Sequence, residues 1–234
     1  MPNSRPIIAL FRILPPPMSP TLPTAAQVID LHDRLLNTPG WPTEAPAPLD
    51  DGLWHWVQAN HRFNCRLWAE EDLARRTTVG AAEIAANKRA IDGFNQARND
   101  ATERVDELLL TALGLVDAAS ARTDAPISTV PPGARLNSET AGSIADRMSI
   151  MALKVHAMRA QTKRSDVAAE HIESSRVKLA RLAQQRADLG ACLAALLADA
   201  QAGRAYFKVY RQFKMYNDPR FNPALVAEAK AQGG

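Results

Sequence analysis

The alternation of apolar and polar positions is helical along most of the chain, and it is most informative between residues 53 and 75. At about 100° per residue, this stretch gathers its apolar side chains on one face, as an amphipathic helix does when it packs on a core. A polar group on such a face costs about 1–3 kcal/mol unless it is paired. Four polar residues nevertheless lie there: Asn60, Asn64, Glu71 and Arg75. The sequence therefore predicts that other helices supply their partners.

Trp68 lies between Asn64 and Glu71 on the same predicted face. We expect its side chain to be buried and to shield the polar groups from water. Replacement of a buried aromatic residue by alanine usually costs about 3–5 kcal/mol, so this interpretation makes Trp68→Ala strongly destabilising.

Helical periodicity recurs in four other stretches of the chain. Alanine and leucine are abundant and runs of β-branched residues are scarce, which favours helices over strands. The stretches are residues 24–36, 81–119, 141–164 and 166–202, separated by loops rich in proline at 39–52 and 120–140. We predict an all-α fold, a helical bundle of five or six helices with a polar cluster in its core.

The same pattern divides the chain into three parts. Residues 1–23 have no periodic apolar face and are interpreted as a disordered tail, or as a misassigned start with Met18 as the true first residue. Residues 24–223 form a single helical domain, and residues 224–234 a C-terminal tail. No apolar run reaches the ~18 residues that span a bilayer, and the N-terminus lacks a convincing signal peptide. We therefore expect no membrane span and a cytoplasmic protein.

Polar residues interrupt the apolar stripes of three predicted helices. Carboxylates, amides and cations on core faces indicate either a structural network that fixes helix register or a pocket for a polar or anionic ligand. In the pocket interpretation, Glu71 and Asp146 position the cations, and four cations face an anionic group. The four cations are Arg75, Lys88, Arg98 and Arg147. No catalytic residue is assigned. The candidate ligand-binding residues are Asn64, Glu71, Arg75, Lys88, Asn95, Arg98, Ser143, Asp146, Arg147 and Lys154.

Ser143 belongs to a short run, residues 138–143, that precedes a predicted helix. Backbone N–H groups at a helix start can bind an anion, but the same residues are typical of a helix cap. No strand is predicted before the run, so it is neither a dinucleotide fingerprint nor a phosphate-binding Walker loop.

Net charge and the spacing of metal-ligand residues restrict the classes of ligand that the sequence predicts. The net charge of +3 does not by itself favour nucleic acid as a partner, and we interpret the aromatic and basic stretch 205–223 as a docking helix with its aromatic residues inward. Cys65 and Cys192 lack metal-ligand spacing and are expected to be small core residues. Neither His61 nor the other helical histidines form a Glu-x-x-His pair. The sequence predicts no metal site and no cofactor.

Four long strings carry a resemblance to a known family: NCRLWAEEDLAR, NKRAIDGFNQARND, LNSETAGSIADRMSIMALKVHAM and FKMYNDPRFNP. They resemble an uncharacterised bacterial family of all-helical proteins, the domain of unknown function 4254. The resemblance covers most of residues 50–223. The family pattern usually has proline where this chain has Ala141. Its members are often associated with glycosyltransferases of lipopolysaccharide or capsule assembly, and no activity of the family is established.

The resemblance implies a role in cell-envelope glycan assembly, and the residues favour a polar pocket. Together they lead us to expect an accessory protein that binds a sugar phosphate or another anionic small molecule, with a glycosyltransferase as a possible partner. Two alternatives stay open. One is an enzyme that acts on a sugar phosphate or nucleotide sugar in the same pocket, with Glu71 or Asp146 as general base. The other is a structural adaptor whose polar network is purely internal.

Overall fold

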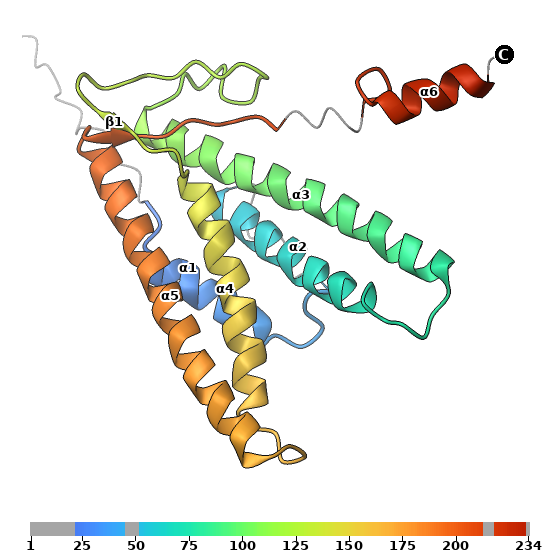
Figure 1. Ribbon diagram of the computed structural model, residues 1–234. Helices are drawn as coiled ribbons and strands as arrows, with labels where there is room; N and C mark the ends of the chain where they lie inside the picture. Colours follow the sequence, from blue (N-terminus) through green and yellow to red (C-terminus); the bar gives the residue numbers. More distant parts are fainter. Residues whose placement is uncertain (1–21, 45–51, 213–217, 233–234) are drawn as a thin grey trace, which may run out of the picture.

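The computed structural model describes residues 22–44, 52–212 and 218–232. Within them the fold is all-α, as predicted, with a single pair of two-residue strands (Figure 1). The elements in chain order are α1 (Ala25–Leu36), α2 (Leu53–Leu73), α3 (Ala81–Leu113), β1 (Arg135–Leu136), α4 (Ala141–Gln161), α5 (Ala169–Gln201), β2 (Ala205–Tyr206) and α6 (Pro223–Gln232).

Local sequence signals account for several helix ends. Thr24 caps α1, since its hydroxyl accepts from the backbone N–H of Gln27 at 3.2 Å while the Gln27 side chain accepts from the Thr24 N–H at 2.9 Å. Gly114 ends α3 with a left-handed φ of 68°, and the following N–H of Leu115 bonds back to the carbonyl of Leu110 at 2.9 Å. Helix α3 therefore ends six residues before the predicted residue 119.

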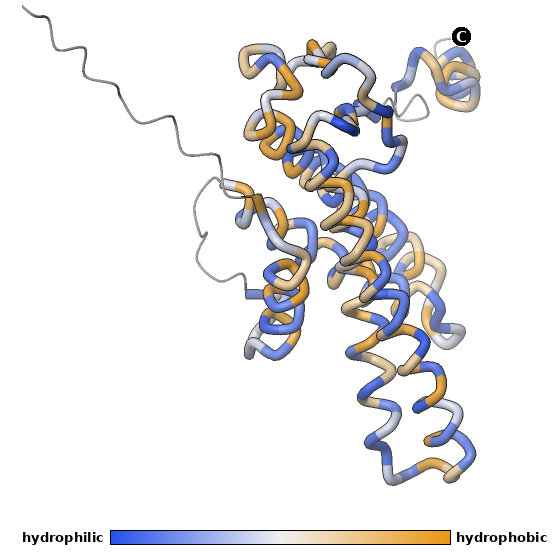
Figure 2. The backbone as a smooth tube through the Cα atoms, turned by 90° about the vertical axis from the view of Figure 1, so that its left-hand side faces the viewer, coloured by the Kyte–Doolittle hydropathy of each residue, from blue (hydrophilic) through white to orange (hydrophobic). Residues whose placement is uncertain are grey.

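The long helices form two hairpins that diverge from a common base. Helix α2 packs along α3, and α4 packs along α5. Helix α4 also contacts α1, α2 and α3, which makes it the central helix. Figures 1 and 2 both show the α4–α5 turn projecting beyond the rest of the molecule. Residues packed in the core at the base include Val28, Leu110, Ile144, Met148, Leu193 and Phe207.

The stretch after α5 differs from the predicted docking helix. It is extended over residues 205–212, where β2 pairs with β1 in parallel register, Arg135 opposite Ala205 and Leu136 opposite Tyr206. Phe207 is fully buried, whereas Tyr210 and Phe221 are exposed. The predicted helix is therefore wrong, and the predicted inward orientation of the aromatic residues is confirmed for Phe207 and wrong for Tyr210 and Phe221. Residues 213–217, which include two more aromatics of this stretch, lie outside the described residues. Helix α6 lies largely in the expected C-terminal tail and buries none of its side chains.

The N-terminal tail that the sequence predicted is described only in part. Residues 1–21, most of the expected tail, lie outside the described residues. Leu22 is described and packs against the core. Among the helices that the structure describes, none is long and apolar enough to cross a membrane.

Candidate functional site

Asp146 on α4 is the centre of the polar cluster at the base of the two hairpins. Its Oδ1 accepts hydrogen bonds from the side-chain amides of Asn60 and Asn64 on α2, each at 2.8 Å. The guanidinium Nε of Arg98 on α3 lies 3.9 Å from the same oxygen. Three helices thus meet through one carboxylate, as the interrupted stripes predicted.

The cluster continues inward through residues that the sequence did not single out as site residues. The Asn60 amide also donates to the Thr102 hydroxyl at 3.0 Å, and Asn64 donates to the Ser149 hydroxyl at 3.0 Å. Ser149 in turn lies 2.7 Å from Nδ1 of His61. These short hydroxyl side chains occur within apolar stripes, where a single serine or threonine resembles a small core residue, so periodicity could not reveal them.

Buried aromatic and sulfur groups surround His61. Its ring stacks on that of His32 with centroids 4.5 Å apart, and the Trp41 indole N–H donates to the Cys65 sulfur at 3.2 Å. Burial lowers the pKa of His61 to about 3 and raises the pKa of Cys65 to about 11. A neutral imidazole beside a protonated thiol is a packing arrangement and not an activated nucleophile. Cys65 is therefore a core residue, as expected.

An open groove of about 450 Å³ lies outside the buried cluster, between α2, α3 and α4. Five of the ten candidate residues line it, and Asp146 lies behind them through its contacts with Asn64 and Arg98. The five are Asn64, Glu71, Arg75, Asn95 and Arg98. Glu71 and Arg75 form an ion pair of 2.7 Å one helical turn apart. Arg98 contributes a buried Nε that has no hydrogen-bond partner among the described residues.

Trp68 lies at this groove and not in the core, so the prediction of a buried screen is wrong. Its side chain is 37% exposed and lines the groove beside Glu71. The reason lies in the divergence of the two hairpins, because α3 and α4 leave an open groove beside Trp68 instead of covering its ring. What the periodicity marked as a core face becomes the wall of a groove.

The remaining candidates do not converge on the same groove. Lys88 is exposed on α3, so the prediction that it faces the core is wrong. Ser143 serves the cap of α4, since its backbone N–H donates to the Thr140 hydroxyl at 3.1 Å. Arg147 and Lys154 lie on the side of α4 that faces α5.

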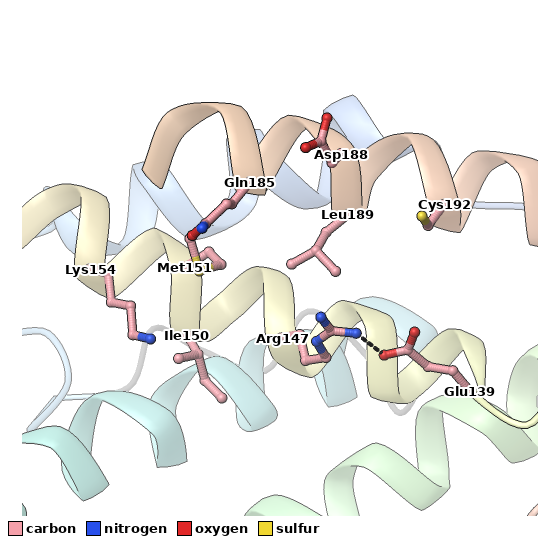
Figure 3. A pocket seen from close by; sticks show the side chains of 9 residues that line it. All are labelled: Glu139, Arg147, Ile150, Met151, Lys154, Gln185, Asp188, Leu189 and Cys192. Atoms are coloured by element: carbon pink, nitrogen blue, oxygen red, sulfur yellow. Dashed lines mark hydrogen bonds and ion pairs between the residues drawn. The ribbon is translucent and has the colours of Figure 1, made fainter. Parts of the chain in front are cut away.

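These last two line a separate pocket of about 620 Å³ between α4 and α5 (Figure 3). There the Arg147 guanidinium pairs with Glu139. Cys192 lines this pocket and is exposed, so its predicted place in the core is wrong. Among the described residues, no group of three or more histidine, cysteine or acidic residues could hold a metal ion.

The fold and the groove define a class: an all-helical protein with two diverging hairpins, a buried polar centre and an open, mixed-charge groove. The sequence model of the family described as "Protein of unknown function (DUF4254)" matches residues 54–209, and the chain belongs to this family. The matched range contains all ten candidate residues. No curated protein and no solved structure matches the chain.

Proposed function

We propose that the protein binds a small polar ligand, a sugar bearing a phosphate, in the groove between α2, α3 and α4. The observation that carries the proposal is the combination of side chains that line the groove. Trp68 presents a partly exposed ring beside two guanidinium groups and two amides. Amides match sugar hydroxyls as donors and acceptors, guanidinium groups match phosphate, and an aromatic face covers the apolar side of a sugar ring.

The charges in the groove favour a ligand that is only partly anionic. Arg75 is already paired with Glu71, and Arg98 lies near Asp146. A further carboxylate, Asp72, also lines the groove. Lys88 and Arg147, the other two cations of the original hypothesis, lie elsewhere. A sugar with one phosphate therefore fits better than a densely charged anion.

The biological setting follows from the family resemblance alone. On that basis we propose a cytoplasmic accessory protein of cell-envelope glycan assembly, with a glycosyltransferase as its partner. The sugar in the groove would then be a donor or acceptor of that assembly.

Calorimetric titration with sugar phosphates and nucleotide sugars tests the proposal. We expect saturable heat with wild-type protein, weaker binding by Trp68→Ala and Arg75→Gln, and unchanged binding by Arg76→Gln. Arg76 is a matched control because it neighbours Arg75 but pairs with Glu83 outside the groove. Separate titrations with inorganic phosphate and with the unphosphorylated sugar measure how much each part of the ligand contributes to the affinity.

One observation supports a second candidate, the structural adaptor. The Asp146 oxygen is satisfied from within the protein by Asn60 and Asn64, so the inner cluster has a sufficient structural role. Absence of heat with every sugar phosphate and nucleotide sugar would leave this candidate in place of the ligand-binding protein, and turnover of a titrant would identify an enzyme.

A further inference from the structure

A further groove, with a volume of about 440 Å³, runs between α4 and α5 beside the pocket of Figure 3, with which it shares Lys154 and Gln185. Met158 on α4 and Leu182 on α5 form its apolar walls, together with Ala157 and the ring of Trp68 on α2. Such an apolar surface in contact with water is a typical feature of a binding site.

Three cations stand around these apolar walls: Lys154, Lys178 and Arg181. No acidic residue is among the groove's lining residues, all of which belong to the described part of the chain. On the projecting hairpin, Asp166 pairs with Arg164 and Glu173 with Arg176. Asp188 lines the neighbouring pocket of Figure 3, and Glu71 and Asp72 line the groove between α2, α3 and α4. The three cations therefore leave the groove positively charged.

The excess of positive charge extends over the whole projecting hairpin. Residues 154–181 contain seven lysines or arginines and three aspartates or glutamates, a net charge of +4 from 7 − 3. The entire chain has a net charge of +3. The positive potential is thus concentrated on the hairpin that carries the apolar groove, which favours an anionic occupant.

We propose that this groove binds an amphipathic anion, a molecule with an aliphatic chain and a phosphate or carboxylate head. The chain lies against Met158, Leu182 and Trp68. The head is held by the cations on both sides of the groove. The site borders the sugar phosphate groove through Trp68, but the proposal does not depend on the ligand of that groove.

Charge and shape argue against the other occupants. A second copy of the chain would bring the same cations face to face. A bilayer is flat, whereas the groove is a hollow between two helices, and the turn at the end of the hairpin is polar, with Arg164 bonded to Asp166. A single molecule that enters the hollow fits both features.

A series of alkyl phosphates from hexyl to decyl, kept below micellar concentrations, tests the apolar part. Burial of one methylene group contributes about 0.8 kcal/mol, so affinity should rise up to about four-fold with each carbon until the groove is filled. Decanol has the aliphatic chain without the phosphate, and inorganic phosphate has the head without the chain. Each should bind much more weakly than decyl phosphate. Equal binding of decanol and decyl phosphate, or no dependence on chain length, would overturn the proposal.

Matched variants locate the site. Leu182→Gln and the double change Lys178→Gln with Arg181→Gln should each weaken decyl phosphate binding at least ten-fold. Val177→Gln replaces an aliphatic side chain and Arg176→Gln removes one positive charge at exposed positions of α5 outside the groove, and the affinity of both variants should equal that of wild type. Lys178 and Arg181 are exposed, so the charge variant should keep its fold, which far-ultraviolet circular dichroism checks.

Two further experiments distinguish a free small molecule from a membrane lipid and from a peptide partner. Vesicles of anionic phospholipid should not retain the protein in a flotation assay; retention that Lys178→Gln with Arg181→Gln abolishes would make the groove a membrane contact and contradict the proposal. An acidic amphipathic peptide that binds where decyl phosphate does not would replace the small molecule by a protein partner.

Discussion

At the scale of single residues, Asp146 determines how the polar face of α2 is satisfied. One oxygen receives two amide donors and lies 3.9 Å from a guanidinium nitrogen. Since Asn60 and Asn64 are buried, loss of the carboxylate leaves their donors without this acceptor. The residue thus couples α4 to α2 and α3 through groups that water cannot easily replace.

Asp146→Ala should lower the free energy of unfolding by about 3 kcal/mol, the order expected when charged hydrogen bonds are lost and buried donors remain. Asp146→Asn keeps an acceptor oxygen and should cost less. Urea denaturation measures both. Asp100→Ala, at an exposed position of α3, serves as the control and should change stability by less than about 0.5 kcal/mol; an equal loss there would remove the special role of Asp146.

Asp106 is a buried carboxyl group, placed where α3 meets the start of α4. Its Oδ1 accepts from the backbone N–H of Gly142 at 2.6 Å. Burial raises the pKa of Asp106 to about 7, with the charges of Glu103 and Glu107 acting in the same direction. The folded protein therefore holds a proton at this group that the unfolded chain releases near pH 4.

This shift predicts a pH dependence of stability. Between about pH 4 and pH 7 the folded state binds more protons than the unfolded state at Asp106, so its contribution to stability falls as the pH rises. It is fully present below pH 4 and lost above pH 7. Asp106→Asn should flatten this part of the profile and be more stable than wild type at pH 8. Thermal melts at pH 5 and pH 8 decide; a variant with the same pH profile as wild type would exclude Asp106 as the cause.

At the scale of elements, the start of α4 approaches α3 so closely that only glycine fits. A Cβ on Gly142 would lie 2.6 Å from the backbone oxygen of Thr102 and 2.9 Å from the Asp106 side chain. The hydrogen bond between Gly142 and Asp106 needs this approach. The absence of a side chain at Gly142 thus allows the central helix to lie this close to α3.

Gly142→Ala should destabilise the protein by about 1–3 kcal/mol, because backbone atoms must move to admit the methyl group. Gly93→Ala offers the opposite case on α3, where a Cβ has nothing within 4 Å. It should stabilise the protein by up to about 1 kcal/mol through helix propensity. Chemical denaturation of the two variants should therefore shift in opposite directions, and a loss at both positions would contradict the close-approach argument.

Arg211 fastens the extended segment after β2 to α3. Its guanidinium lies 2.8 Å from Glu103, 2.6 Å from Glu107 and 2.9 Å from the carbonyl of Ala121. Glu107 is buried and is also contacted by Arg104. One side chain therefore joins the chain end, a helix and the loop after α3.

Arg211→Met should cost about 1–3 kcal/mol, since it removes one of the two cations that contact the buried Glu107 carboxylate while Arg104 remains. Addition of Glu107→Gln should recover part of that loss because the buried charge is gone. Arg220→Met, which breaks an exposed pair with Asp218, is the control and should be nearly silent. Unfolding curves of these three variants and of Glu107→Gln alone test this; additive losses in the double variant would show that the pair is not coupled.

At the scale of the whole molecule, periodicity predicted the helices well because each stripe is a local property. The cap at Thr24 and the stripe of α1 needed no tertiary information. Whether a stripe is buried, by contrast, depends on how the helices pack against one another. Trp68 and Asn64 share a face and line the same groove, yet Asn64 is buried and Trp68 is 37% exposed, because the hairpins diverge between them.

The same limit explains the candidate site. Helix α4 packs against four helices, and the sequence marked polar residues on it. The sequence did not indicate which side of α4 each polar residue faces. Asp146 meets α2, whereas Arg147, one residue on, lines the pocket beside α5. A rotation of about 100° per residue thus separates candidates that are neighbours in sequence.

Burial is uneven along both hairpins, and this predicts where the molecule opens. The buried residues of α4 lie between Ala141 and Val155, and those of α2 end at Cys65. Between residues 156 and 185 only Ser175 is buried, and none is buried between residues 66 and 90. Segments with few buried contacts open at lower free energy than the core.

Hydrogen exchange should therefore be faster at both hairpin ends than at the shared base, although all these segments are helical. Decyl phosphate, if it occupies the α4–α5 groove, should slow exchange around Met158 and Leu182. It should leave residues 76–90 at the end of the α2–α3 hairpin unchanged, so the molecule contains its own control. Uniform protection along the helices would contradict the uneven stability, and equal slowing at both ends would show that the ligand acts on the fold as a whole and not in the groove.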